Sequence, residues 1–388
     1  MKRVVLAITF AGFVLSLATQ VLAQSPVFRS AYYQYRLVTV ADGLVHPWSI
    51  AFLPGGDILI TERPGRLRIV REGKLLAESV HGTPKVFAEG QGGLLDVVPH
   101  PDFLSNRLLY LSFAKPNGDG SQATTAVVRG RFENDRLTNV EEIFVAVSQG
   151  RGHYGSRLAF DRNGFLFITV GERQAPSSGD LEAHPAQDLS NHHGTTIRLH
   201  DDGQIPADNP YIDQAGAKPE IWSYGHRNAQ GLAIHPDTGD VWLNEHGPQG
   251  GDELNLVLPG RNYGWPVIGY GVNYRSGLAI HEGTHREDME APVHVWIPSI
   301  ATSGMMIYTG NRFPEWRGSI FVGGMKDEDE QLARLTMDGQ AVKLEETLVH
   351  GMGRIRDVRQ GLDGYIYLAI DHREGEPTSV VRIEPVEN

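Results

Sequence analysis

Histidine, carboxylate and cationic side chains recur in this sequence beside short apolar stretches. Six times, an apolar stretch is followed by a turn rich in Gly, Asp, Asn or Pro and then by a second apolar stretch. Before the first stretches stand His46, Gln91, His153, Arg227 with Asn228, Thr302 with Ser303, and Arg354 with Arg356. After the second stretches stand Glu172, His246-Gly247-Pro248, Lys326 and Asp371. Any one of these residues alone fits a hydrogen-bonded turn, but their recurrence indicates a shared site.

His153 and Glu172 are the pair best suited to acid–base chemistry. Histidine is the usual general base near neutral pH, and a carboxylate at the end of the paired strand could hold its second ring nitrogen. His153 is one of 16 histidines in the chain. A hydrogen-bonded turn histidine is therefore the alternative interpretation.

Four cations stand at the repeated positions, namely Arg227, Lys326, Arg354 and Arg356. Like charges gathered in one pocket repel one another strongly unless an anion or carboxylates compensate them. Convergence of the four cations would therefore indicate a polyanionic ligand. The alternative is pairing with acidic residues nearby in the sequence, which are Asp327, Asp329 and Asp357.

The run NEHGPQGGDELNLV from Asn244 has the composition of a site for a hard cation. Its Gly-Pro turn can point carbonyl oxygens at an ion, and Asp252 and Glu253 add carboxylates. Calcium binds about six to eight oxygen ligands, often of both kinds. The run therefore favours calcium over zinc, with a solvated acidic turn as the alternative.

Two common motifs occur in contexts that exclude their usual function. His281-Glu282-Gly283-Thr284-His285 matches a zinc-protease pattern, which needs a helix to bring both histidines to one face. A glycine and a β-branched residue in a polar stretch oppose such a helix. The run from Gly150 to Gly155 spells G-x-G-x-x-G, but it leads into a strand and does not open the helix of a dinucleotide-binding unit.

The elements that must position these residues are predicted to be the blades of a β-propeller. The chain has 45 glycines and 22 prolines among 388 residues, which favours many short strands and tight turns. The six strand pairs begin at His46, Gly92, Gly155, Gln230, Ser303 and Ile355. An all-β, six-bladed propeller with four-stranded antiparallel blades explains these repeats better than unrelated hairpins in two domains. In a propeller, both sets of polar positions lie on one face around the central channel.

Composition excludes several classes of function. The formal net charge is −12, with 35 Lys and Arg against 47 Asp and Glu. This acidity disfavours nucleic acid or an anionic membrane surface as a partner. The chain has no cysteine, so disulfides, thiolate metal sites and a cysteine nucleophile are excluded.

The N-terminus is predicted to be an export signal. Lys2 and Arg3 precede an apolar run from Val4 to Leu17, and Val21-Leu22-Ala23 resembles a cleavage site. We expect residues 1–23 to be removed and residues 24–388 to form a single propeller domain, periplasmic or secreted. The later sequence has no apolar run of about 18 residues, so we expect no membrane span. An uncleaved anchor is the alternative.

Seven motifs resemble, in order, those of the soluble aldose sugar dehydrogenases that depend on pyrroloquinoline quinone (PQQ), relatives of soluble quinoprotein glucose dehydrogenase. They are GQGGLLDVV from Gly90, HYGSRLAF from His153, IWSYGHRNAQG from Ile221, LNEHGPQGGDELN from Leu243, NYGWP from Asn262, SGM from Ser303 and GRIRDVR from Gly353. The resemblance extends over roughly residues 37–385. It implies a six-bladed propeller that holds PQQ, a planar tricarboxylate, over the central channel.

The resemblance also implies two sets of binding residues. The residues expected to contact PQQ are Gln91, Arg227, Asn228, Tyr274, Lys326, Arg354 and Arg356. The carbonyls of Gly247 and Pro248 would hold the calcium that binds PQQ. Glu253 and the carbonyl of Tyr263 would bind a second, structural calcium.

The reaction implied by the resemblance is oxidation of an aldose at C1 to the lactone. His153 would remove the proton of the anomeric hydroxyl while a hydride passes to the C5 carbonyl of PQQ, which calcium polarises. Arg227 would stabilise the developing oxyanion, and Glu172 would orient the imidazolium. An external acceptor would then take the electrons, and the protein would be a monomer or a homodimer.

Two positions depart from the family pattern. Gly152 stands where the glucose dehydrogenases carry an acidic residue, which leaves selectivity for glucose open, and Ala229 follows Asn228 where close relatives have proline. The polar stretch from Arg275 to Glu290 has no assigned match.

Two other classes of function also remain. A calcium-dependent propeller hydrolase such as a lactonase would not need four convergent cations, and a propeller that only binds a partner would not need His153.

Overall fold

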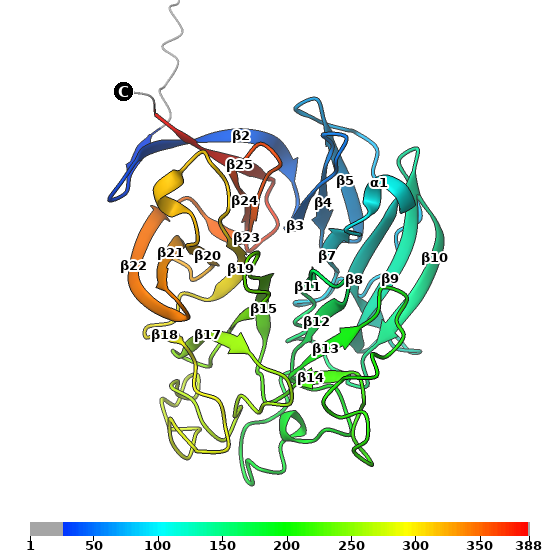
Figure 1. Ribbon diagram of the computed structural model, residues 1–388, viewed down its shortest axis with the longest axis vertical. Coiled ribbons are helices and arrows are strands. Elements are labelled where there is room, and N and C mark those ends of the chain that lie inside the picture. Colours follow the sequence, from blue (N-terminus) through cyan, green and yellow to red (C-terminus); the bar gives the residue numbers. More distant parts are fainter. Residues whose placement is uncertain (1–25, 387–388) are drawn as a thin grey trace, which may run out of the picture.

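The computed structural model describes residues 26–386, which form a ring of six antiparallel β-sheets (Figure 1). The predicted six-bladed β-propeller is therefore confirmed. The segment predicted to be cleaved, residues 1–23, lies outside the described residues.

Five blades are built outward from the central channel in chain order. The first has β3 (Pro47–Phe52), β4 (Ile58–Glu62), β5 (Arg66–Arg71) and β6 (Lys74–Leu75). The second has β7 (Leu94–Pro99), β8 (Leu108–Pro116), β9 (Ala123–Glu133) and β10 (Arg136–Val145). The third has β11 (Leu158–Phe160), β12 (Leu166–Val170), β13 (Thr195–Leu199) and β14 (Ile221–Ser223). The fourth has β15 (Ala229–Ile234), β16 (Val241–Glu245), β17 (Asp252–Val257) and β18 (His294–Trp296). The fifth has β19 (Thr302–Ile307), β20 (Ile320–Gly324), β21 (Gln331–Asp338) and β22 (Ala341–His350).

The sixth blade joins the two ends of the described chain. Its inner strands are β23 (Arg354–Gln360), β24 (Ile366–Asp371) and β25 (Thr378–Pro385), and β2 (Gln34–Leu44) pairs antiparallel with β25. The short β1 (Val27–Arg29) adds a fifth strand outside β2. In Figure 1 the blue β2 lies along the red β25, so the N-terminal strand closes the ring.

All six predicted strand pairs are present as the two innermost strands of a blade. The second strands are rich in β-branched and aromatic residues, which suit a strand covered on both faces by neighbouring blades. Strand β12, with the sequence LFITV, and strand β20, with the sequence IFVGG, are buried at every residue.

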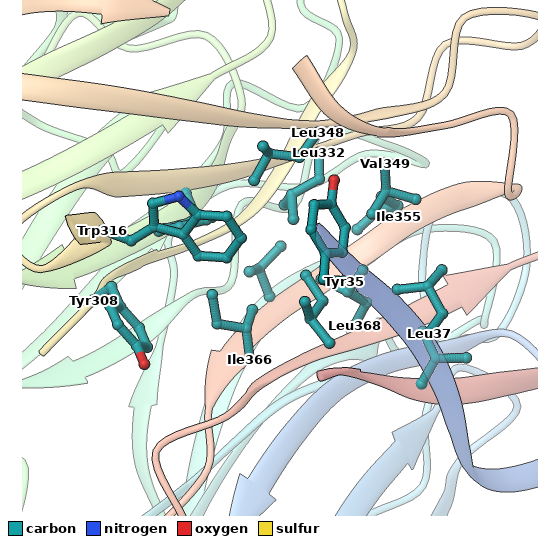
Figure 2. Close-up of a cluster of buried hydrophobic side chains, with 14 of the residues drawn as sticks. Tyr35, Leu37, Tyr308, Trp316, Leu332, Leu348, Val349, Ile355, Ile366 and Leu368 are labelled. Carbon is teal, nitrogen blue, oxygen red and sulfur yellow. The ribbon is translucent and has the colours of Figure 1, made fainter. Parts of the chain in front are cut away.

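A large apolar cluster fills the space where the ring closes. Tyr35 and Leu37 of β2 pack into a cluster with Trp316, Leu332 and other residues of the last two blades (Figure 2). Burial of a large apolar side chain contributes about 1.5–3 kcal/mol. The non-local contacts of β2 therefore hold the first and last parts of the chain together.

Helix is scarce among the described residues. One α-helical turn, α1 (Phe103–Asn106), and two 3₁₀ turns, η1 (Pro185–Gln187) and η2 (Pro314–Trp316), lie in connections. Within residues 26–386, no helix has the length and apolar character needed to cross a membrane.

Both motifs that the sequence context excluded lie outside helices. Residues 281–285 belong to a loop, in which Gly283 forms an isolated bridge with Ile268. The glycine-rich run from Gly150 to Gly155 leads into β11. Neither segment has the helix that its usual chemistry requires.

Candidate functional site

The predicted polar positions meet at one end of the inner strands, around three cavities that share His246 as a lining residue. A cavity of about 360 Å³ is lined by Gln91, Asn228, Arg354, Arg356 and Asp371, among others. A cavity of about 550 Å³ is lined by Gln91, His153, Glu172, Arg227 and Tyr274, among others. A cavity of about 780 Å³ is lined by Tyr274, Lys326 and Arg354, among others. The catalytic and cofactor-contacting residues expected from the sequence are thus brought together.

His153 and Glu172 form a direct pair. Nδ1 of His153 lies 2.6 Å from Oε1 of Glu172. A carboxylate accepts hydrogen bonds, so Nδ1 carries the proton and Nε2 keeps a lone pair. Oε2 of Glu172 accepts a hydrogen bond from the Ala175 N–H at 2.7 Å, which fixes the carboxylate.

The backbone around His153 is tightly constrained. His153 has a φ of 47°, an uncommon left-handed value for a residue with a side chain. Its N–H donates to Oε1 of Gln91 at 2.7 Å, and its carbonyl accepts a hydrogen bond from the Arg173 guanidinium. A Cβ at Gly171 would lie 2.2 Å from that carbonyl oxygen. Only glycine therefore fits at position 171.

The surroundings of His153 favour the neutral imidazole. Burial, and then the positive charge of Arg227, hold the pKa of His153 below its usual 6.5, although Glu172 opposes the shift. Beside this imidazole, the pKa of Glu172 is lowered although burial opposes that shift. The pair is therefore a neutral histidine beside an ionised carboxylate, which is the state a general base requires.

Arg227 is held from two sides. Its backbone N–H donates to Oε2 of Glu245 at 2.5 Å, and Nη1 of its guanidinium donates to the His246 carbonyl at 3.1 Å. Its guanidinium lies over the Trp265 ring at 5.1 Å. The buried Nε of Arg227 has no hydrogen-bond partner among residues 26–386. This arrangement leaves donor capacity for a ligand in the cavity.

His246 is the lining residue common to the three cavities. Its Nε2 lies 2.6 Å from the Thr302 carbonyl oxygen, which accepts the hydrogen bond. Burial lowers the pKa of His246 to about 4, with Arg227 among the charges that add to the shift. His246 is therefore neutral near pH 7.

Arg354 and Arg356 enter the 360 Å³ cavity from the start of β23. Their only carboxylate contacts within the described chain are weak or peripheral, with Asp371 at 3.8 and 4.0 Å and Asp327 at 3.1 Å from Arg354. Burial, with Arg354 among the cations that add to it, lowers the pKa of Arg356 to about 9. The Nε atoms of both arginines are buried without a hydrogen-bond partner among residues 26–386. An anion in the cavity would relieve this arrangement.

Pairing with nearby acids accounts for part of the cation set. Nζ of Lys326 lies 3.6 Å from Asp329, and about two fifths of its side chain is exposed. Asp357 pairs elsewhere, with Arg157 and Arg359 at 2.9 Å each. Pairing with the named acids therefore accounts for Arg354 and Lys326, which contact Asp327 and Asp329, but it does not account for Arg356.

The remaining predicted contact residues have protein partners. Oδ1 of Asn228 accepts hydrogen bonds from the Gly155 N–H at 3.2 Å and from Gln230 at 3.1 Å. Tyr274 is half-exposed, and its hydroxyl donates to the Pro248 carbonyl at 3.0 Å.

The Gly-Pro turn and the acidic run form a fourth, much smaller cavity of about 20 Å³. It is lined by Glu245, Gly247, Pro248, Glu253 and Tyr263, among others. Asn255 donates to both Glu245 and Glu253, at 3.1 and 3.2 Å. Burial and the charge of Glu245 raise the pKa of Glu253 to about 8. The described residues include no group of three His, Asp or Glu side chains placed to hold a metal. Any cation here would thus need carbonyl ligands as well.

Of three further repeated polar positions, His46 and Ser303 have side chains with structural contacts, and Thr302 does not. Nδ1 of His46 lies 2.9 Å from Asp371. Ser303 donates to the Ile355 carbonyl at 2.5 Å. The Thr302 hydroxyl is buried without a partner among residues 26–386.

Sequence reasoning missed several lining residues. Arg63 and Arg373 line the 360 Å³ cavity beside Arg354 and Arg356, and Gln174 and Trp265 line the cavity of His153. Arg63 follows β4 directly, at the position that the repeat predicts for polar groups, so that signal was available. Gln174 had no such signal, because a turn decides where it points.

The fold and the site define a β-propeller enzyme class with a histidine–carboxylate pair and a buried cationic pocket at one channel mouth. The family model described as Glucose / Sorbosone dehydrogenase matches residues 44–382, and the chain belongs to this family.

Individual relatives agree with this assignment. The chain is 45% identical over 345 residues to the aldose sugar dehydrogenase YliI of Escherichia coli strain K12, covering 86% of this chain and 90% of that protein. A crystal structure of a glucose dehydrogenase has a TM-score of 0.84 at 47% identity, covering 90% of this chain and 99% of the other. The PQQ-bound aldose sugar dehydrogenase of Streptomyces coelicolor has a TM-score of 0.71 at 27% identity, covering 90% and 98%.

Proposed function

We propose that this protein is a sugar oxidoreductase that oxidises aldoses at C1 to the lactone, using PQQ and calcium. The observation that carries this proposal is the neutral His153, paired with Glu172 at 2.6 Å. The same channel mouth holds the arginine cluster, which consists of Arg227, Arg354 and Arg356. Membership of a sugar dehydrogenase family and a PQQ-bound relative support it.

The residues present fit a tricarboxylate cofactor. Buried arginine Nε atoms without partners, on Arg227, Arg354 and Arg356, are suitable donors to carboxylates. Gln91, Asn228, Tyr274 and Lys326 line the adjoining cavities and would complete the contacts. When bound, PQQ would accept a hydride from the sugar, and calcium would act as a Lewis acid toward it.

The chain itself would manage the proton. Nε2 of His153 would take the proton of the anomeric hydroxyl, since Nδ1 is already committed to Glu172. Glu172 would stabilise the imidazolium that forms. Arg227 would stabilise negative charge on the sugar oxygen, because its guanidinium lines the same cavity and has an unpaired buried Nε.

Calcium is proposed at two places. The carbonyls of Gly247 and Pro248 would hold the ion that acts with the cofactor, and the carbonyl of Pro248 retains a lone pair beside its bond from Tyr274. Glu253 and the carbonyl of Tyr263 would hold a second ion at the 20 Å³ cavity. The raised pKa of Glu253 supports a cation there, because a cation would compensate the buried negative charge.

The wider setting of the reaction is also a proposal. We infer export by removal of residues 1–23, and a mature domain of residues 24–388 in the periplasm or outside the cell. An external acceptor would reoxidise the cofactor. The protein would act as a monomer or a homodimer.

Reconstitution tests the function directly. Purified protein with PQQ and Ca²⁺ should develop the absorption of bound quinone and reduce an artificial dye when an aldose is added. Dye reduction without added PQQ, or none with it, would contradict the proposal. Hydrolysis of a lactone without PQQ would favour a calcium-dependent hydrolase, and the absence of both activities would favour a binding propeller.

A further inference from the structure

The glycine-rich run from Gly150 to Gly155 supports a strained turn beside the proposed base. In the turn from Glu172 to Ala175, the Ala175 N–H donates to the Glu172 carbonyl at 3.2 Å. The two central residues, Arg173 and Gln174, have φ values of 63° and 59°. Consecutive left-handed residues define a type I′ turn, which ordinarily uses glycine, asparagine or aspartate. Strain of this kind persists only where the surroundings enforce it, and it concentrates at functional sites.

Arg173 anchors this turn. Its buried guanidinium donates to the His153 carbonyl and to the Thr125 hydroxyl, and it lies over the Tyr154 ring at 4.7 Å. A Cβ at Gly150 would lie 2.8 Å from Cβ of Arg173. The first glycine of the run therefore leaves the space that the Arg173 backbone occupies.

Gly152 has the same relation to Gln174. A Cβ at Gly152 would lie 2.7 Å from both Cδ and Oε1 of Gln174, so the amide packs over the residue that precedes His153. Gln174 lines the 550 Å³ cavity together with His153 and Glu172. No group of residues 26–386 hydrogen-bonds to its amide. The turn thus holds a free donor and acceptor beside the base.

We propose that Gln174 is a specificity-determining residue whose amide recognises the sugar hydroxyl next to the oxidised carbon. This inference rests on the proposed aldose oxidation. In an aldose, the carbon next to the oxidised carbon carries its own hydroxyl, and Gln174 lines the same cavity as His153, with its amide over Gly152, the residue that precedes His153. A hydroxyl both donates and accepts, as an amide does. A site that hydrogen-bonds a hydroxyl discriminates against the analogue that lacks it.

Two variants test this role with reconstituted holoenzyme, using kcat/KM for glucose and for 2-deoxyglucose. Gln174→Ala should lower kcat/KM for glucose about three- to tenfold and leave that for 2-deoxyglucose within about twofold. Gly152→Ala should have the same effect, because its methyl group displaces the amide while its φ suits alanine. The exposed Gln214, in a loop that lines none of the three cavities, provides the control Gln214→Ala.

The double variant gives the decisive comparison. If Gly152 acts through Gln174, adding Gly152→Ala to a protein that already carries Gln174→Ala should not reduce its discrimination between the two sugars any further. If the ratio of kcat/KM for glucose to kcat/KM for 2-deoxyglucose is unchanged in Gln174→Ala, whether or not both values fall, the assignment is overturned. Wild-type protein that oxidises no aldose would instead overturn the proposed function, so the two failures are distinguishable. Thermal unfolding and PQQ titration should be unchanged in each variant.

Discussion

Glu172 binds His153 through Oε1 and the Ala175 N–H through Oε2, so one carboxylate orients the imidazole and closes the turn that carries Gln174. The two groups come from the start and the end of one strand pair in the third blade. The pairing fixes which ring nitrogen is available, because a proton on Nδ1 leaves the lone pair on Nε2.

Replacing the proposed base should separate chemistry from binding. His153→Ala should lower turnover about 10²- to 10⁴-fold, which is the usual contribution of a general base. The affinity for PQQ should remain near that of the wild type, because the arginine cluster is untouched. Stopped-flow reduction by sugar and a PQQ titration measure the two quantities. Near-normal turnover would exclude His153 as the base.

The pH profile should reflect the lowered pKa of His153. Only the neutral imidazole accepts a proton, so kcat/KM should rise with pH through a pKa below 6.5 and then level off. Glu172 raises this pKa, and Glu172→Gln should therefore move the acidic limb to still lower pH while lowering the maximum. Rates from about pH 4 to about pH 8 test both statements. A limb that moves to higher pH would contradict them.

Removing a buried arginine should weaken cofactor binding. Arg356→Ala removes a guanidinium whose Nε has no partner within residues 26–386, and a hydrogen bond to a charged group contributes about 1.5–3 kcal/mol. The dissociation constant for PQQ should therefore increase about tenfold or more. Arg36→Ala is a suitable control, since Arg36 is half-exposed and pairs with Glu384 away from the channel mouth. Equal affinities in the two variants would contradict an anion site.

Calcium should stabilise the apo-protein. A ligand that binds only the folded state raises stability by mass action, by about 2.7 kcal/mol at a hundredfold excess over its dissociation constant. Thermal unfolding with added Ca²⁺ and with a chelator measures the effect. In Glu253→Gln the stabilisation should shrink, while Glu78→Gln, on an exposed loop, should retain it. The same response in both variants would remove Glu253 from the calcium site.

The closing strand should carry a large share of the stability of the ring. Tyr35 of β2 is fully buried, and Tyr35→Ala should cost about 3–5 kcal/mol of unfolding free energy. Tyr32 is 55% exposed, and Tyr32→Ala should cost less than about 1 kcal/mol. Urea unfolding of both variants tests this difference. Comparable losses would mean that β2 does not close the ring.

The sequence by itself determined the repeated unit and the residues placed at its ends. Apolar stretches and turn composition are local properties, so they predicted six strand pairs and placed His153 before one strand and Glu172 after its partner. The same local repeat put Arg227, Arg354 and Arg356 at equivalent positions. A ring then converts equivalent positions into neighbouring ones, and this is why so much of the site followed from the sequence.

Only the tertiary structure decided which of these neighbours touch and what lies between them. The pairing of β2 with β25, and of His46 with Asp371, joins residues more than 300 positions apart, and no local pattern encodes such contacts. The position of Gln174 depends on the space left by Gly152, which requires the packed backbone of two loops. Local composition therefore specifies elements and their polar ends, whereas ring closure and loop packing determine the geometry of the site.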